Sequence, residues 1–291
     1  MPGQTLHSGL HLVVGGDGVI GRALFAHLSA RKLPVVATTR RPGAAAFPFL
    51  DLAQLDAALP DFGPVRVAYL CAAITSLAAC RREPEASRRI NVEAPIALAH
   101  RLADQGALVV GLSTNLVLDG RTARAPAEAE PAPQCAYGRQ KADLERELLA
   151  LGDRGCAVRL TKVIFPEMPL FTGWASTLRA GGTVQAFDDL VFSPIALSAT
   201  VEALVRIGTD AVDGVVQLSG NADLTYADAA RYLAAAWGIP SDRVRAVESS
   251  TAGVTLDARP RHTTLDTTRA EALLGWTLPD PWTVLDEVSG A

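Results

Sequence analysis

The sequence predicts an α/β fold, a doubly wound parallel sheet with a smaller C-terminal region. Three observations indicate it. Apolar, strand-like runs alternate with helical patterns in the first half of the chain, a glycine-rich loop joins the first run to the first helix, and the regular alternation stops after Phe165-Pro166. Such alternation is typical of a parallel sheet covered by helices on both faces. The 291 residues are enough for one large domain or two intimate ones.

The expected strands are short apolar runs, and the expected helices carry apolar residues at helical spacing. The predicted strands cover residues 10–14, 34–39, 65–71, 107–112 and 156–162. The predicted helices cover residues 18–32, 52–59, 84–104, 136–151, 225–237 and 267–274.

A glycine-rich loop follows the first predicted strand. Gly15, Gly18 and Gly21 have the spacing Gly-x-x-Gly-x-x-Gly, and a helical pattern runs on from them. Glycines at such positions permit a tight turn, a close approach of backbone N–H groups to a pyrophosphate, and close packing of helix on strand. The helix N-terminus then favours the phosphates. The loop predicts a Rossmann-type dinucleotide site, with cofactor contacts from Gly15, Asp17, Gly18, Val19, Ile20 and Gly21.

The end of the second predicted strand indicates which dinucleotide binds. NAD enzymes usually carry Asp or Glu there, which accepts hydrogen bonds from the ribose 2′-OH. This chain has Thr38-Thr39-Arg40-Arg41 and no acid at that place. A guanidinium can bind a 2′-phosphate through charge-assisted hydrogen bonds. We therefore predict NADP(H), with Thr39 and Arg40 as contacts; the alternative is a solvated basic turn.

A Tyr-x-x-x-Lys sequence lies in the helix predicted over residues 136–151. Tyr137 and Lys141 are four residues apart, so on a helix they share one face. A lysine ammonium beside a phenol favours the phenolate and lowers the pKa of the tyrosine toward neutrality. Such a tyrosine can pass a proton to a carbonyl oxygen and take it back. The alternative is an exposed helix face with a lysine over an aromatic ring.

The glycine loop and the Tyr-x-x-x-Lys pair together resemble the extended short-chain dehydrogenase/reductase family. Within it the chain is most similar to the branch of dTDP-4-dehydrorhamnose reductase. The Ser-Thr-Asp-Tyr-Val-Phe-x-Gly segment of that branch corresponds to Ser-Thr-Asn-Leu-Val-Leu-Asp-Gly at residues 113–120. Further similar stretches, in the same order along the chain, are residues 72–76, 83–84 with 91–92, 193–195, and 259–260 with 265–267.

The resemblance implies NADPH-dependent reduction of a keto group, with C4 of a nucleotide-linked 4-keto sugar as the expected centre. Tyr137 is expected to donate the proton. Lys141 is expected to lower the pKa of Tyr137 and to hydrogen-bond the nicotinamide ribose. Thr114 orients the carbonyl through its hydroxyl, with Ser113 as the alternative because neighbouring strand residues point in opposite directions.

The resemblance and the strand ends add further expected contacts. Those to the cofactor are Asp51, Leu52, Cys71, Ala72 and Ala73. Those to the substrate are Thr75, Asn115, Lys162 and Arg261. Three of these have local alternatives. Asp51 could cap the helix that follows it, Lys162 could pair with a nearby acid instead of an anionic substrate group, and Arg261 could be a surface residue.

The chain is expected to have two parts. Residues 1–165 form the dinucleotide-binding part, residues 166–291 form the smaller substrate-binding region, and elements around residues 190–218 are expected to return to the first part. Ligands of doubly wound sheets bind in the crevice at the carboxyl ends of the strands. We expect the small-molecule substrate to lie there, between the two parts.

Three alternative functions stay open within this framework. An epimerase of the same superfamily would hold NAD tightly, but it would need the acid that is missing after the second strand. A sugar-nucleotide 4,6-dehydratase would need Asp-Glu where this chain has Asn115-Leu116. A non-catalytic, NADP-binding regulatory subunit is the third, because the regulatory subunit of methionine adenosyltransferase resembles the same branch.

Composition excludes several other classes. The net charge of −4 gives no electrostatic footprint for nucleic acid or an anionic membrane. No apolar stretch approaches the length needed to cross a bilayer, and the run after His11 is too short for a signal peptide. The four cysteines lack Cys-x-x-Cys spacing, which favours reduced thiols over a metal site or a disulfide framework. We therefore expect a cytoplasmic protein without a bound metal, with a homodimer as the commonest form of assembly for such a protein.

Overall fold

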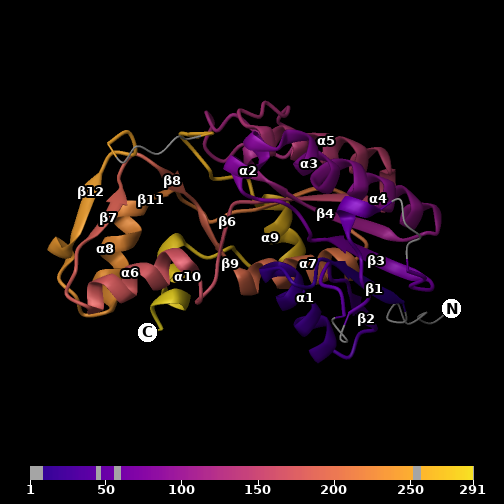
Figure 1. Ribbon diagram of the computed structural model, residues 1–291, viewed down its shortest axis with the longest axis horizontal. Helices are drawn as coiled ribbons and strands as arrows, with labels where there is room; N and C mark the ends of the chain where they lie inside the picture. The colour runs from indigo at the N-terminus through magenta and orange to yellow at the C-terminus, as the bar shows by residue number, and fades with distance from the viewer. Residues whose placement is uncertain (1–8, 44–46, 56–59, 252–256, 291) are drawn as a thin grey trace.

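A six-stranded parallel sheet forms the centre of the molecule (Figure 1). The computed structural model describes residues 9–43, 47–55, 60–251 and 257–290. The strand order is β10-β5-β4-β3-β1-β2, and every neighbouring pair is parallel. The strands are β1 (Leu10–Val14), β2 (Val35–Ala37), β3 (Val65–Leu70), β4 (Leu108–Thr114), β5 (Gly155–Leu160) and β10 (Gly214–Leu218).

The sheet reverses its direction of winding between β1 and β3. β2 lies on one side of β1, and β3, β4, β5 and β10 follow on the other side. In open α/β sheets a ligand-binding crevice forms at this switch point, outside the carboxyl ends of the strands. The loops that follow β1 and β3 therefore border the expected cofactor site.

Helices cover both faces of the sheet (Figure 1). α1 (Val19–Ala30) and α7 (Leu197–Thr209) pack together on one face, and α4 (Ala94–Asp104) and α5 (Ala136–Ala150) cover the other. Strand alternation supplies both cores. Val13 belongs to the core that contains α1, whereas Leu12 and Val14 belong to the core beside α4 and α5. The predicted fold class is confirmed.

The helix predicted over residues 84–104 is interrupted. α2 (Leu77–Arg82) and α3 (Pro84–Arg88) precede a π-helical turn, η2 (Arg89–Glu93), and α4 follows. The buried side chain of Asn91 anchors this turn through hydrogen bonds. Its amide donates to Ile74 O at 2.9 Å and to Gln140 Oε1 at 2.8 Å, and its oxygen accepts from Ile74 N–H at 2.8 Å. Asn91 thus ties the helical layer to the loop after β3.

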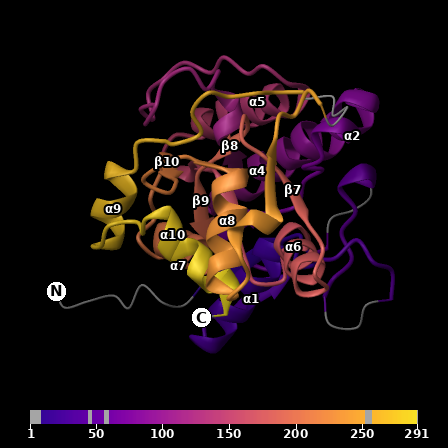
Figure 2. The ribbon, with the colours of Figure 1, turned by 90° about the vertical axis from the view of Figure 1, so that its left-hand side faces the viewer.

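A smaller lobe lies at the carboxyl ends of the strands (Figure 2). It contains α6 (Pro169–Arg179), α8 (Tyr226–Ala236) and α10 (Pro281–Ser289). β7 (Val184–Phe187) pairs in parallel with β12 (Val244–Val247), and β8 (Val191–Phe192) pairs antiparallel with β11 (Leu224–Thr225). One hydrophobic core runs from α1 and the sheet into this lobe, where it includes Phe171 and Leu233.

The chain passes between the sheet and the lobe several times. After β5 it forms β6 (Lys162–Ile164), which pairs with β9 (Pro194–Ala196). It then returns through α7 to β10, which pairs with β5 at the edge of the sheet. α9 (Thr268–Leu274) packs beside α7 and β10.

Short 3-10 turns complete the described chain. They are η1 (Leu52–Gln54), η3 (Asn115–Val117), η4 (Gly152–Arg154) and η5 (Ser241–Arg243). η1 replaces the start of the helix predicted over residues 52–59, and the rest of that prediction, residues 56–59, lies outside the described residues. None of the described helices is both long enough and apolar enough to cross a membrane.

Candidate active site

A cavity of about 560 Å³ lies at the carboxyl ends of the strands, between the sheet and the smaller lobe. Both layers of helices and both parts of the chain contribute to it. Its wall includes Ile20 of α1, Thr114 of β4, Tyr137 and Lys141 of α5, and Tyr226 of α8. The structure therefore brings the three expected catalytic side chains together with the start of the helix that follows the glycine loop.

Tyr137 and Lys141 lie on the face of α5 that borders this cavity. Cys135 Sγ caps the helix by accepting a hydrogen bond from Gly138 N–H at 3.3 Å. Tyr137 is 9% exposed and Lys141 is 3% exposed. Lys141 Nζ lies 5.9 Å from the centre of the Tyr137 ring, and it donates a hydrogen bond to Leu112 O at 2.8 Å.

Burial controls the ionisation of this pair. It lowers the pKa of Lys141 to about 8, although the charges of Cys71 and Glu145 oppose the shift. It raises the pKa of Tyr137 well above its ordinary value, and the Cys80 and Cys135 thiols raise it further. The predicted lowering of the tyrosine pKa is therefore wrong, because burial removes the hydration that a phenolate needs. The phenol is protonated at neutral pH, which is the form that donates a proton.

The structure distinguishes the two neighbouring hydroxyls at the end of β4. Ser113 Oγ donates to Glu145 Oε1 at 2.5 Å, within a buried network behind the strand. Thr114 Oγ1 accepts from Leu116 N–H at 3.2 Å and donates to the neutral amide oxygen Asn115 Oδ1 at the longer distance of 3.5 Å. Since the hydroxyl of Ser113 is engaged with a carboxylate, Thr114 is the better candidate for a contact with the substrate.

The glycine loop has the geometry that a pyrophosphate site requires. Gly15 has φ +95°, and a Cβ atom there would lie 2.8 Å from Ala72 N. A Cβ on Gly21 would lie 2.2 Å from Gly15 O, so the helix packs directly on the turn. A Cβ on Gly18 would meet only Gly15 O at 3.5 Å, and none of the described side chains caps the N-terminus of α1. Its first N–H groups are thus available to an anion.

The loop after β3 lies beside the glycine loop. Cys71 and Ala73 line the same cavity as Ile20, and Ala72 packs against Gly15. These positions fit the cofactor contacts expected from the sequence. The cavity then continues to Tyr137, so a dinucleotide on the N-terminus of α1 could reach the candidate catalytic side chains.

The carboxylate of Asp17, in the glycine loop, lies beside the end of β2. Thr39 Oγ1 donates a hydrogen bond to the carboxylate of Asp17 in the glycine loop. Arg41 Nε lies 4.0 Å from Asp17 Oδ1, and Arg41 N–H donates to Thr39 Oγ1 at 3.0 Å. Arg40 is exposed, and no ion pair involves it within the described part of the chain. Arg40 is therefore available to a 2′-phosphate, whereas Thr39 is engaged with Asp17.

Asp51 and Leu52 have local roles in the structure. Asp51 Oδ1 accepts a hydrogen bond from Ala53 N–H at 2.9 Å and so caps η1. Leu52 is buried in the core beside α4. The alternative reading of Asp51 as a cap is thus observed, and contact of these two residues with adenine stays a prediction.

The expected substrate contacts separate into two groups. Thr75, Asn115 and Lys162 line the cavity. Arg261 is exposed and lies outside it, and that part of the wall is formed by Pro260 and Thr263 instead. Contact of Arg261 with the substrate stays a prediction.

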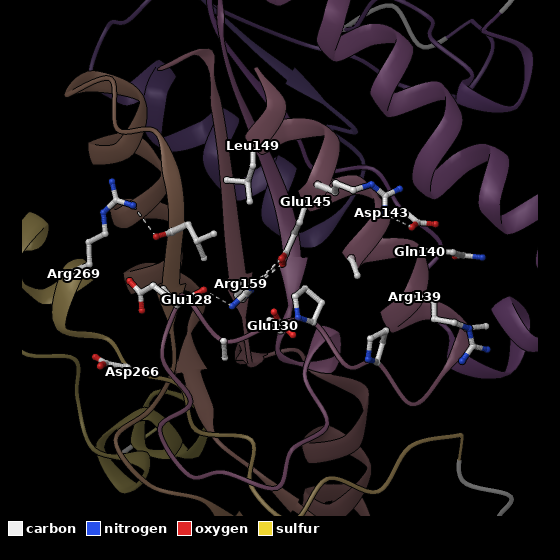
Figure 3. Close-up of a pocket in the computed structure, with 18 of the residues that line it drawn as sticks. Glu128, Glu130, Arg139, Gln140, Asp143, Glu145, Leu149, Arg159, Asp266 and Arg269 are labelled. Atoms are coloured by element: carbon white, nitrogen blue, oxygen red, sulfur yellow. Dashed lines mark hydrogen bonds and ion pairs between the residues drawn. The ribbon is translucent and has the colours of Figure 1, made fainter. Parts of the chain in front are cut away.

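A second, larger cavity of about 1290 Å³ lies beside α5, next to residues 127–133 (Figure 3). Two pairs of its charged side chains are engaged with one another. Glu145 and Arg159 point toward one another and are joined at 2.8 Å, and Asp143 pairs with Arg88 at 2.6 Å. This cavity is lined by neither Tyr137 nor Lys141, and we therefore place the candidate active site in the smaller cavity.

Comparison with known proteins agrees with this fold. The sequence model of the family described as RmlD substrate binding domain matches residues 11–288. The chain belongs to this family. The resemblance drawn from the glycine loop and the Tyr-x-x-x-Lys pair is thereby confirmed.

Two relatives of this RmlD-family chain are informative. The dTDP-4-keto-6-deoxy-D-glucose reductase of Streptomyces niveus is 32% identical and covers 87% of each chain. Methionine adenosyltransferase 2 subunit beta of Xenopus laevis is 27% identical over 92% of this chain and 84% of its own length.

A solved structure is also similar. The dTDP-4-dehydrorhamnose reductase of Bacillus anthracis str. Ames, solved in complex with NADP, has a TM-score of 0.84 at 16% identity, covering 96% of this chain and 97% of that chain. That likeness shows the shared fold.

Proposed function

We propose that this RmlD-family protein is an NADPH-dependent reductase of a keto group, with C4 of a nucleotide-linked 4-keto sugar as the expected centre. One observation carries the proposal: Thr114, Tyr137 and Lys141 line one cavity together with Ile20, at the start of the helix after the glycine loop. The S. niveus relative is named as a reductase of such a sugar. We place the reduction of the keto group in this cavity.

The residues present fit NADP(H). The uncapped N-terminus of α1 would hold the pyrophosphate, and Cys71 and Ala73 would border the dinucleotide in the cavity. Arg40 would contact the 2′-phosphate, because its guanidinium has no ionic partner among the described residues. When bound, the dinucleotide supplies the hydride.

The side chains of this chain supply the proton and the orientation. Thr114 Oγ1 accepts from Leu116 N–H, and its own proton, which makes only a long contact of 3.5 Å with Asn115 Oδ1, can turn to the substrate oxygen. Tyr137, protonated because it is buried, donates its proton to the same oxygen as negative charge develops there. The ammonium of Lys141, 5.9 Å from the ring centre, then stabilises the phenolate that forms.

A comparison of two tyrosine variants tests this assignment. We expect Tyr137→Phe to lower kcat for a dTDP-4-keto-6-deoxy sugar by about 10² or more, the usual contribution of a general acid. The dissociation constant for NADPH should change little, since only the hydroxyl is removed. Tyr232→Phe is the matched control, because the Tyr232 hydroxyl donates to Asp286 in the smaller lobe and not to the cavity. A nearly normal kcat in Tyr137→Phe would exclude the proton-donor role.

A second candidate function is a non-catalytic, NADP-binding subunit of another enzyme. The observation that favours it is the match to methionine adenosyltransferase 2 subunit beta over 92% of this chain. Asn115-Leu116, which replaces the Asp-Tyr of the reductase branch, also favours a non-catalytic subunit. Tight binding of NADPH without its oxidation, across a panel of 4-keto sugar nucleotides and simple diketones, would favour this function over the reductase.

A further inference from the structure

Two polar side chains that follow β5 also line the candidate active site. The proposed proton transfer does not use them. Thr161 and Lys162 are adjacent in the chain, and both line the cavity that contains Tyr137. Their backbones are fixed by the fold: Thr161 N–H donates to Leu218 O at 3.2 Å, and Lys162 N–H donates to Ser193 O at 3.3 Å. Both side chains are therefore presented from a rigid strand end.

The hydroxyl of Thr161 has no hydrogen-bond partner among the residues that the structure describes. The residue is 9% exposed. Among the buried polar side-chain atoms of the described residues, only Thr161 Oγ1 and His27 Nε2 make no hydrogen bond. A buried hydroxyl without a partner loses its hydration and gains no hydrogen bond in return, which destabilises the fold. A ligand in the cavity would supply the missing partner.

Lys162 is a cation without a carboxylate. Its Nζ lies 5.5 Å from the centre of the Tyr226 ring, and that ring packs on Phe192 with 4.6 Å between ring centres. No salt bridge to Lys162 occurs in the described part of the chain. The alternative that Lys162 pairs with a nearby acid therefore lacks support. The aromatic face holds the ammonium at the cavity wall and leaves its donors free.

The charges around the cavity have one sign. Lys141 and Lys162 both line it, and its described wall includes no Asp or Glu. Lys141 is buried and bonded to Leu112 O. Lys162 is thus the free donor that faces the substrate side, beside the smaller lobe. In a cavity of lowered dielectric, a positive charge of this kind favours an anionic ligand over a neutral one.

We propose that Thr161 Oγ1 and Lys162 Nζ bind an oxyanion carried by the substrate, a carboxylate or a phosphate, in the same cavity as Tyr137. The hydroxyl donates one hydrogen bond, and the ammonium donates a charge-assisted one. This inference rests on the proposed function, because it assigns the group to the substrate of that reaction. The oxyanion belongs either to an acidic sugar or to the phosphates of a nucleotide.

Calorimetric titration of the NADPH-saturated protein tests the proposal with two probes, dTDP and D-glucuronate. The variants are Lys162→Met, which keeps a soft contact with the Tyr226 ring, Lys162→Arg and Thr161→Val. We expect Lys162→Met to weaken the binding of one probe about tenfold or more, the usual effect of losing a hydrogen bond to a charged group. Thr161→Val should weaken the same probe, and Lys162→Arg should largely retain it.

Lys32→Met is the matched control, because it removes an exposed lysine that follows α1 and does not line the cavity, and it should leave both affinities unchanged. Loss of dTDP binding identifies the oxyanion as a phosphate, and loss of glucuronate binding identifies it as a carboxylate. The proposal is overturned if neither probe depends on Lys162, which includes the case in which neither probe binds.

The same experiment separates this proposal from the reductase assignment. An unchanged melting temperature and an unchanged affinity for NADPH in Lys162→Met show that the fold and the cofactor site are intact. The titration needs no turnover, so it can fail while Tyr137-dependent oxidation of NADPH with a neutral diketone is observed. Conversely, absent turnover with Lys162-dependent binding of a probe would refute the reductase and leave the oxyanion site.

Discussion

The buried ion pair between Glu145 and Arg159 is expected to dominate the response of this protein to single substitutions in its core. The two side chains are 2% and 3% exposed. Arg159 Nε donates to Glu145 Oε1 at 3.0 Å, Arg159 Nη2 donates to Oε2 at 2.8 Å, and Ser113 Oγ donates to Oε1 at 2.5 Å. We consider Glu145→Met, which removes the carboxylate and keeps most of the volume.

The magnitude follows from what remains around the guanidinium. After the substitution, Arg159 retains Ala127 O at 3.0 Å and Gln217 Oε1 at 3.2 Å, but no negative charge. Breaking a buried pair in this way costs about 3–5 kcal/mol, because an uncompensated charge is left in the core. Replacing both partners by apolar residues is often nearly neutral. The double variant with Arg159→Met should therefore be more stable than Glu145→Met alone.

Urea unfolding followed by far-ultraviolet circular dichroism measures these differences. At a slope of roughly 3 kcal/mol per molar urea, the midpoint of Glu145→Met should fall by about 1 to 1.7 M. Asp210→Asn is the surface control. Asp210 pairs with Arg206 at 2.7 Å with both side chains at least 36% exposed, and such pairs contribute about 0.3–0.5 kcal/mol. If Glu145→Met costs no more than this control, or if the double variant is the less stable of the two, the reasoning is refuted.

Two further predictions concern the glycine loop. Asp17→Asn removes the carboxylate to which Thr39 donates. We expect this variant to lower KM for NADPH relative to KM for NADH by roughly three- to tenfold, the effect of removing one negative charge near a phosphate. An unchanged ratio of the two KM values would place Asp17 away from the 2′-phosphate. Gly21→Ala brings a Cβ to 2.2 Å from Gly15 O, and it should lower the free energy of unfolding by about 1–3 kcal/mol. Gly173→Ala lies in a helix with open space around it, and it should raise the free energy of unfolding by up to about 1 kcal/mol. Thermal unfolding of the two alanine variants decides the second prediction, and equal shifts of the two would contradict it.

The sequence was sufficient where the signal was local. Residues 10–14 are a mostly apolar run followed at once by glycine, and the structure forms β1 over the same residues. The helix predicted over residues 136–151 is observed as α5 (Ala136–Ala150), because its polar and apolar residues alternate at helical spacing. The Tyr-x-x-x-Lys pair needed only that helix in order to face one cavity.

Features that depend on distant residues could not be predicted in this way. The pairing of β7 with β12 joins segments separated by the whole of α7, β10 and α8, and nothing in either short strand specifies the other. The carboxylate beside the end of β2 comes from Asp17 in the glycine loop, so inspection of the residues after the strand could not find it. Burial, which raises the pKa of Tyr137, is likewise a property of the folded chain.

The position of β10 has a consequence for any attempt to prepare the N-terminal half of the chain alone. β5 is buried along its whole length, and β10 supplies hydrogen bonds to it from Gly214 through Leu218. A fragment that ends near residue 165 would lack that neighbour and would present an apolar strand with unpaired backbone groups. Such a strand recruits any other chain that can extend the sheet. We therefore expect the fragment to self-associate, and a soluble preparation to require the polypeptide through residue 218.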